Sequence, residues 1–326
     1  MKQNLFEARH QAQWQGFAEH LQALEKGTRD AAASEGFGHE YRRICQHLAL
    51  ARERGYSRHL VESLQQLAMR GHQQFYRHHN QSASGLLGFV VAGFPRRVRT
   101  EWRFVALAGL LFIAGLLGMG LLVYCVPELV YSVMSVEQVT DMQAMYKPDV
   151  SRLGRLAERA SSEDWMMFGY YIMNNIGIAF QTFASGLLLG LGSLFFLLYN
   201  GLLIGAVAAH LTDIGSGQTF WPFVIGHGAF ELTAIVLAGA AGLKLGWALL
   251  SPGRLSRGAA LRVAAGHSVQ LMGGVILMLL VAAFIEAYWS SMTWPAPWIK
   301  YLAGGLSWTL VAAWLLLSGR DRHATQ

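Results

Sequence analysis

Residues 104–126 read FVALAGLLFIAGLLGMGLLVYCV, 23 consecutive positions without a charged side chain. A helix of about 20 predominantly apolar residues is long enough to cross the hydrocarbon core of a bilayer. Pro127 and Glu128 end the run, and Trp102 and Arg103 precede it with side chains suited to the membrane–water boundary. The run therefore predicts a transmembrane helix.

The chain continues in the same manner towards its C-terminus. Between residues 168 and 211 only His210 is ionisable, and this length allows two spans joined near Gly190–Ser193, or one span with a re-entrant piece. Further apolar runs cover residues 220–250, 263–285 and 298–317. We therefore expect an all-α, polytopic membrane protein with about six transmembrane helices in residues 104–318.

The overall composition agrees with this fold class. Hydrophobic residues make up 53% of the 326 residues and charged residues only 14%, which excludes an ordinary soluble domain. Cys45 lies in the polar N-terminal part and Cys125 in the first apolar run, which excludes a disulfide scaffold. The first residues run into a polar stretch without an apolar core, so we expect no cleaved signal peptide.

Residues 1–83 predict a bundle of three amphipathic helices, over residues 4–25, 40–54 and 58–80, because apolar side chains recur there at spacings of three and four. A loop is expected at Gly36–Gly38. The histidines of this part lack the spacing of zinc ligands, so we expect no metal and no cofactor. Its positive charge comes without a nucleic-acid-binding motif, so we expect no nucleic-acid partner.

Residues 84–103 join an apolar run to a cluster of arginines. The run is too short to cross a membrane, but it is suited to an amphipathic helix that lies in the interface. The arginines would then bind anionic lipid headgroups at the membrane surface: Arg96, Arg97, Arg99 and Arg103.

The loops predict an orientation, because Lys and Arg are retained on the cytoplasmic side of a membrane. The basic N-terminal part, the linker 251–262 and the tail 319–326 would share the cytoplasm. The acidic loop 127–167 would lie outside. We therefore expect a multi-pass protein of the bacterial inner (cytoplasmic) membrane with both termini cytoplasmic.

Several polar side chains fall inside the apolar runs, where they are costly and often functional. They are Asn174, Asn175, Gln181, Asn200, His227 and Glu231. Asn174 and Gln181 are spaced to share one helical face. His227 and Glu231 are four residues apart and therefore adjacent on a helix. Gly226 and Gly228 flank His227, and together with the length of this run they predict a broken or re-entrant helix near residues 220–232.

The His227–Glu231 pair allows three interpretations. The two side chains could be part of a metal site, although no HExxH motif supplies the rest of a zinc protease site. They could form a proton or ion relay, because a buried carboxylate and an imidazole titrate together. They could simply hydrogen-bond and fix the packing of helices.

Several of these motifs resemble the stage II sporulation protein M (SpoIIM) family of bacterial and archaeal integral membrane proteins. In the apolar part the resemblance rests on Asn174-Asn175 through Phe183-x-x-Gly186, Asn200-Gly201-x-x-x-Gly205, His227-Gly228-x-x-Glu231-x-x-Ala234 and Gly239-x-x-Gly242. In the polar part it rests on Tyr41-Arg42, Leu48-Ala49-x-Ala51-Arg52, His72-x-x-x-Tyr76 and Phe94-Pro95-x-x-Val98-Arg99. Gly226 stands where the family pattern has a proline.

The resemblance implies an inner-membrane address and a cell-envelope complex, with envelope proteins or a MoxR-type ATPase as partners. We expect no enzyme activity and no catalytic residue, because the sequence holds no complete catalytic set. The first hypothesis is a homo-oligomeric scaffold or organiser of an envelope complex. The alternative is a channel or transporter that uses the buried His/Glu/Asn cluster. A third is an intramembrane metal-dependent hydrolase.

Overall fold

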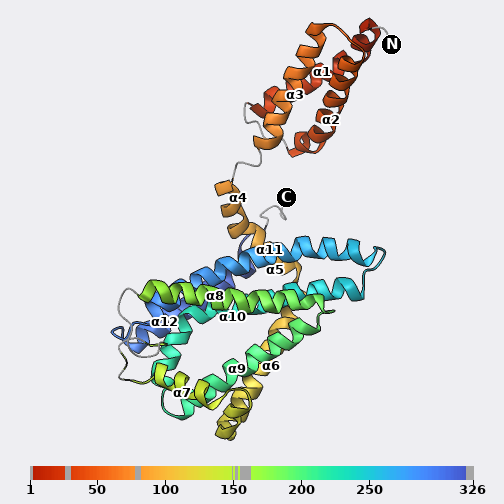
Figure 1. The fold of residues 1–326 in the computed structure, drawn as a ribbon. Helices are drawn as coiled ribbons and strands as arrows, with labels where there is room; N and C mark the ends of the chain where they lie inside the picture. Colours follow the sequence, from red (N-terminus) through yellow and green to blue (C-terminus); the bar gives the residue numbers. More distant parts are fainter. Residues whose placement is uncertain are drawn as a thin grey trace. The chain divides into compact units, whose positions relative to one another are not determined.

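The computed structural model describes residues 3–25, 31–77, 82–148, 150, 153–154 and 163–320. Within these ranges every regular element is a helix, which confirms the all-α fold class (Figure 1). Contacts divide the chain into two compact units, Met1–Leu87 and Gly88–Gln326. We call the first unit the head and the second unit the body.

The head contains three helices, α1 (Gln3–Glu25), α2 (Ala31–Glu53) and α3 (Arg58–Arg77). Each contributes a stripe of apolar side chains to one core: Phe6, Trp14, Phe17, Leu21, Phe37, Ile44, Ala51, Leu60, Leu64 and Ala68. Ion pairs join the helices at the edge of the core, between His20 and Glu40 at 2.8 Å and between Arg70 and Glu25 at 2.9 Å. The helices expected from the apolar spacing are therefore present.

The start of α2 corrects one expectation. The helix begins at Ala31, so the loop predicted at Gly36–Gly38 is wrong. Phe37, between the two glycines, is buried and stacks on Phe17 with ring centroids 5.4 Å apart. Burial of this aromatic side chain offsets the low helix propensity of the glycines.

A buried histidine lies in the core of the head. The Trp14 indole Nε1–H donates a hydrogen bond to His47 Nδ1 at 3.0 Å, which requires this nitrogen to be unprotonated. The ring of His10 lies 4.1 Å from that of His47, centroid to centroid. Burial lowers the pKa of His47, and the charges of His10 and Arg43 lower it further. His47 is therefore neutral in the folded head.

We expect the head to lose stability as the pH falls below 6.5, the ordinary pKa of histidine. Below that value the unfolded chain binds a proton on His47 that the folded chain resists, so acid favours unfolding. Hydrogen exchange of α1 and α2 in the full chain, compared at pH 7 and about pH 5, measures the effect. His47→Gln should remove most of the pH dependence, and the exposed His59→Gln should leave it unchanged. Equal protection at both pH values, after correction for intrinsic exchange rates, would contradict this expectation.

Helix α4 (Ser82–Gly88) ends at the boundary of the two units, and the body begins with the π-helical turn η2 (Phe89–Gly93) and α5 (Phe94–Thr100). Residues 82–100 are helical throughout, so a helix is present where one was expected over residues 84–103, and its place in the membrane interface stays a prediction. Phe94 is fully buried against Gly274, whose missing side chain leaves room for the ring. Residues 94–98 thus belong to the core of the body.

The four arginines of this region have contacts within the chain. Arg99 donates to the carbonyls of Leu315 and Ser318, both at 2.7 Å, and so satisfies carbonyls at the end of the last helix. The remaining three contacts are Arg96 with the Gly319 carbonyl at 3.2 Å, Arg97 with Gln270 at 3.0 Å and Arg103 over the Trp102 ring at 5.7 Å. Arg99 therefore joins α5 to the C-terminal end of the last helix.

Among the described residues, five helices of the body are long and apolar enough to cross a membrane. They are α6 (Trp102–Cys125), α9 (Leu191–Asp213), α10 (Gly217–Leu250), α11 (Arg257–Phe284) with its π-helical extension η5 (Ile285–Ser290), and α12 (Pro297–Leu317). A further helix, α8 (Glu163–Ala184), runs beside α10 and α11 but is not one of the five (Figure 1). Asn174, Asn175 and Gln181 make α8 more polar, and the described residues hold five candidate spans where about six were expected.

α10 corrects a second expectation. It is continuous over 34 residues, so the broken or re-entrant helix predicted near residues 220–232 is wrong. Gly226 and Gly228 are buried within the helix. A Cβ at Gly226 would lie 3.4 Å from Ser290 Oγ, so this glycine lets α10 approach η5 closely. Gly228 faces only side chains of its own helix, Val224 and Leu232, and neither glycine breaks α10.

The remaining connections follow from local sequence. α8 passes through a 3-10 turn, η4 (Ser185–Leu187), and Gly190 takes a left-handed φ of +86° before α9 begins, which places the predicted junction near Gly190. The loop after α6 contains η3 (Pro127–Ser132) and α7 (Val136–Met145). Ser135 and Gln138 form a capping box at the start of α7.

Candidate functional site

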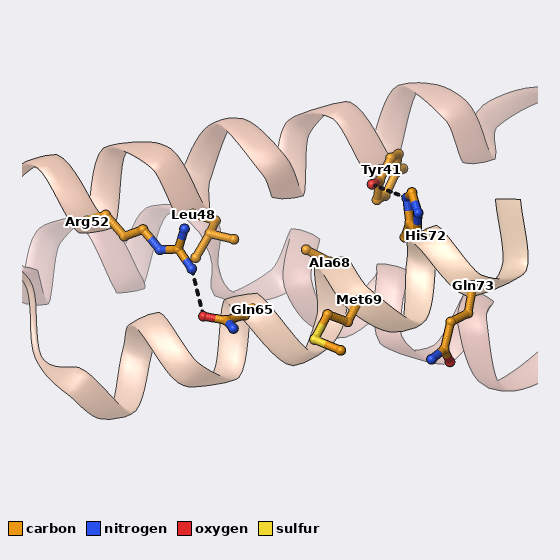
Figure 2. A pocket seen from close by; sticks show the side chains of 8 residues that line it. All are labelled: Tyr41, Leu48, Arg52, Gln65, Ala68, Met69, His72 and Gln73. Atoms are coloured by element: carbon orange, nitrogen blue, oxygen red, sulfur yellow. Dashed lines mark hydrogen bonds between the residues drawn. The ribbon is translucent and has the colours of Figure 1, made fainter. Parts of the chain in front are cut away.

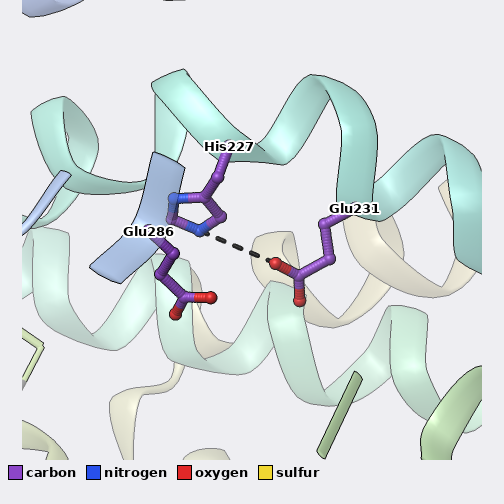
Figure 3. A group of neighbouring side chains, drawn as sticks. All are labelled: His227, Glu231 and Glu286. Atoms are coloured by element: carbon purple, nitrogen blue, oxygen red, sulfur yellow. Dashed lines mark ion pairs between the residues drawn. The ribbon is translucent and has the colours of Figure 1, made fainter. Parts of the chain in front are cut away.

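Three ionisable side chains of the body, one histidine and two glutamates, meet between α10 and η5. His227 and Glu231 extend from adjacent turns of α10, and Glu286 extends from η5 into the same space (Figure 3). One ligand atom from each side chain lies within 4.8 Å of the other two, and His227 Nε2 is 3.8 Å from Glu231 Oε2. Glu231 Oε2 and Glu286 Oε2 are shielded from solvent and accept no hydrogen bond. The cluster therefore presents three ligand atoms that converge on one point.

The second ring nitrogen of His227, Nδ1, has a hydrogen-bond partner on η5. His227 is 5% exposed, and its Nδ1 lies 3.1 Å from Ser290 Oγ, with the Phe223 carbonyl beside the same ring. Nδ1 thus has a hydrogen-bond partner, and Nε2 faces Glu231 Oε2 at 3.8 Å.

Lys300 holds the other half of the site in place. It lies in the first turn of α12 and is only 2% exposed. Its ammonium group donates to the Ser290 carbonyl at 2.8 Å and to the Met292 carbonyl. These bonds fix the end of η5, which carries both Glu286 and Ser290.

A tyrosine from the loop between α6 and α8 lies near the cluster. Tyr146 caps α7, and its ring packs on Phe223 of α10 with centroids 5.5 Å apart. Burial raises the pKa of the Tyr146 phenol well above its usual value, and the charges of Glu286 and Glu231 add to the effect. Tyr146 is therefore a neutral hydrogen-bonding group near two carboxyl groups.

The predicted polar residues do not all converge. Asn175 is buried and lies beside Glu286. Asn174 and Gln181 are exposed, although the Asn174 amide donates to Asn175 Oδ1 at 2.9 Å. Asn200 donates to the Phe196 carbonyl of its own helix at 2.7 Å. A single cluster of these amides with His227 is therefore wrong, because α8 turns only one of its amides inwards.

Sequence reasoning missed Glu286, Lys300 and Tyr146 as neighbours of the cluster. Glu286 carries one usable signal, an acidic residue next to a long apolar run. Its distance of 55 residues from Glu231 hides the contact. Only the packing of η5 on α10 brings the two carboxyl groups together.

A second buried ionic cluster joins the start of α6 to α10 and α11. The Lys244 ammonium group pairs with the Glu101 carboxylate, whose side chain is 7% exposed. Arg97 at 3.9 Å and His267 at 3.8 Å approach the same carboxylate. Lys244 therefore has a buried partner within the body.

The head has a groove between α2 and α3 with a volume of about 350 Å³ (Figure 2). Its lining combines apolar and polar side chains: Tyr41, Leu48, Arg52, Gln65, Ala68, Met69, His72 and Gln73. Arg52 donates to Gln65 at 2.7 Å across the groove. The groove is therefore a candidate surface for binding another protein.

The fold and the site define a polytopic helical membrane protein with a buried histidine–glutamate cluster. The family description "Stage II sporulation protein M" (SpoIIM) matches residues 103–291, more than half of the chain and all of the cluster. The chain belongs to the SpoIIM family. Residues 4–77 match a domain of unknown function (DUF8413). No curated protein and no solved structure matches the chain.

Proposed function

We propose that this protein is a homo-oligomeric scaffold of the bacterial inner membrane that organises a cell-envelope complex. In this proposal α8 forms the contact between copies, and the head faces the cytoplasm and binds the partner. The observation that carries the proposal is the exposed face of α8 in a body made of apolar helices.

The exposed face of α8 repeats at spacings of three and four residues. Its members are Met166, Tyr170, Met173, Asn174, Gly177 and Gln181. Amide side chains are costly against lipid and stabilise contacts between transmembrane helices. Apart from its two chain neighbours and the backbone of α8 itself, no described residue lies within 4 Å of a Cβ placed on Gly177, so a second helix can approach closely there. Asn174 uses one amide proton in its bond to Asn175 Oδ1 at 2.9 Å, and its second amide proton and its oxygen can pair with the amides of an identical α8.

We expect the double substitution Asn174→Leu with Gln181→Leu to shift the protein from oligomer towards monomer. Each lost interhelical hydrogen bond is worth about 0.6–2 kcal/mol, so two of them weaken association roughly tenfold or more. Light scattering of the purified chain over a dilution series in detergent measures the shift.

The matched control is Thr309→Val on α12. Thr309 is also exposed and polar, but its hydroxyl donates to the Gly305 carbonyl of its own helix at 2.8 Å. It should leave the oligomer unchanged. An unchanged oligomer in the α8 variant, or a monomeric wild-type chain at every concentration, would sink the proposal.

In this proposal the head is the part that binds the partner. Its groove offers an arginine, a tyrosine and an amide next to an exposed methionine, a mixture suited to a protein surface. A partner of the kind implied for the family, an envelope protein or a MoxR-type ATPase, is part of the same proposal.

A channel or transporter is the second candidate, favoured by the convergence of His227, Glu231 and Glu286 within the apolar body. Ionisable groups in such positions often mark ion paths. This candidate requires cation flux in proteoliposomes that Glu231→Gln abolishes while the oligomer persists. Absence of flux in the wild-type chain would remove it.

A further inference from the structure

We propose that His227, Glu231 and Glu286 bind one divalent metal ion of the zinc type. This inference goes beyond the scaffold proposal and is independent of the oligomeric state. It also departs from the expectation, drawn from the sequence, that the chain binds no metal. Its basis is the geometry of three side chains from two helices.

The donor set selects the class of metal. One imidazole and two carboxylates are ligands that Zn²⁺ accepts, whereas Mg²⁺ prefers oxygen ligands and retains its waters. Three protein ligands leave a coordination position open, as in zinc sites that bind a further small ligand.

The distances allow an ion to enter with little movement. Ligand atoms about 2.0–2.2 Å from a tetrahedral zinc ion lie roughly 3.3–3.5 Å from one another. In the structure His227 Nε2 and Glu231 Oε2 are 3.8 Å apart, and all three ligand atoms lie within 4.8 Å. Rotation about the side-chain torsions of the two glutamates closes this difference.

The surroundings of His227 are those of a metal ligand. Its Nδ1 is hydrogen-bonded to Ser290 Oγ at 3.1 Å, and its Nε2 faces the two carboxyl groups. Metal-binding histidines usually have such a partner on the second nitrogen, because it fixes the tautomer and the ring. Lys300 in turn holds the Ser290 backbone.

Charge gives the strongest argument. Two buried carboxylates repel each other in a medium of low dielectric constant. Within the described part of the chain, His227 is the one basic side chain within 4 Å of either glutamate, and an imidazole that offers a lone pair to an ion carries no charge. A divalent cation neutralises both carboxylates and satisfies the oxygens that accept no hydrogen bond.

The test is metal content of the full chain in detergent. The purified protein is incubated with Zn²⁺ alone or Mg²⁺ alone, dialysed, and analysed for bound metal. The wild-type chain should retain one more equivalent of zinc than His227→Gln, Glu231→Gln or Glu286→Gln, and no magnesium. His210→Gln, which changes a buried histidine of α9 outside the cluster, should retain the full amount. Equal zinc in the wild-type chain and the folded cluster variants would overturn the proposal.

X-ray absorption of the zinc-loaded wild-type chain tests the proposal without any substitution, in case the variants do not fold. Cys45, Cys125 and the histidines of the head are the competing ligands. We expect oxygen and nitrogen ligands with one imidazole. A sulfur ligand, or several imidazoles, would place the ion elsewhere and overturn the assignment.

Discussion

Gly242→Ala is expected to destabilise the body by at least about 3 kcal/mol, the upper end of the usual cost of overpacking. A Cβ at Gly242 would overlap Ser193 Oγ and lie 2.7 Å from the Phe183 carbonyl oxygen. Ser193 cannot turn aside freely, because its hydroxyl donates to the Thr182 carbonyl at 2.6 Å. Thermal unfolding of the purified chain in detergent measures the loss.

Gly228→Ala is the matched control on the same helix. Its added Cβ would lie 3.6 Å from a methyl group of Val224, an ordinary van der Waals contact. Alanine also has the higher helix propensity, so this variant should equal or slightly exceed the wild-type chain in stability. Equal stability of the two variants would show that α10 does not contact α8 and α9 as closely as described.

Lys244→Met should cost about 3–5 kcal/mol of stability, because it leaves the Glu101 carboxylate buried without its ammonium partner. The side chains of Lys244 and Glu101 are 15% and 7% exposed, so water screens the pair little. His267 and Arg97 approach Glu101 only at 3.8 and 3.9 Å and replace little of the lost contact. Unfolding of the chain in detergent again provides the measurement.

The double variant Lys244→Met with Glu101→Met tests whether the loss of stability comes from the unpaired charge of Glu101 or from the altered packing of residue 244. Apolar replacement of both partners removes the stranded charge and should recover most of the loss. The exposed Arg103→Met is the control for removal of a positive charge and should change stability little. If Lys244→Met and Arg103→Met behaved alike, the buried ion pair would be refuted.

Much of the fold is predictable because membrane helices carry a strong signal. The run 104–126 is long and uncharged, the apolar stretches after residue 190 carry few charges, and the structure has helices at each of them. The junction near Gly190 is also predictable, since a glycine with positive φ between two apolar runs is a common helix end.

The errors arise where packing overrides a local signal. Gly36 and Gly38 predict a loop, but the helical conformation of this segment buries Phe37 in the core of the head. Gly226 and Gly228 predict a break, but both lie inside a continuous helix, where Gly226 faces η5 and Gly228 faces side chains of its own helix. The sequence alone does not show whether a glycine ends a helix or lies inside a packed one.

The candidate site is only half predictable. His227 and Glu231 are linked by the helical spacing of four residues. Glu286 requires knowledge of which helices pack together, and that information is not local. The same limit applies to α8, where spacing predicts that Asn174 and Gln181 share a face but not that this face is exposed.

Cysteine crosslinking along α8 tests the central proposal, a homo-oligomer, most directly. Cys45 and Cys125 are first replaced by alanine, and a single cysteine is placed at Met173, which is 78% exposed on α8. In native membranes Met173→Cys should form a disulfide-linked dimer, whereas Leu310→Cys, at an exposed position of α12, should not. A crosslink at neither position, or equal crosslinking at both, would contradict an oligomer built on α8.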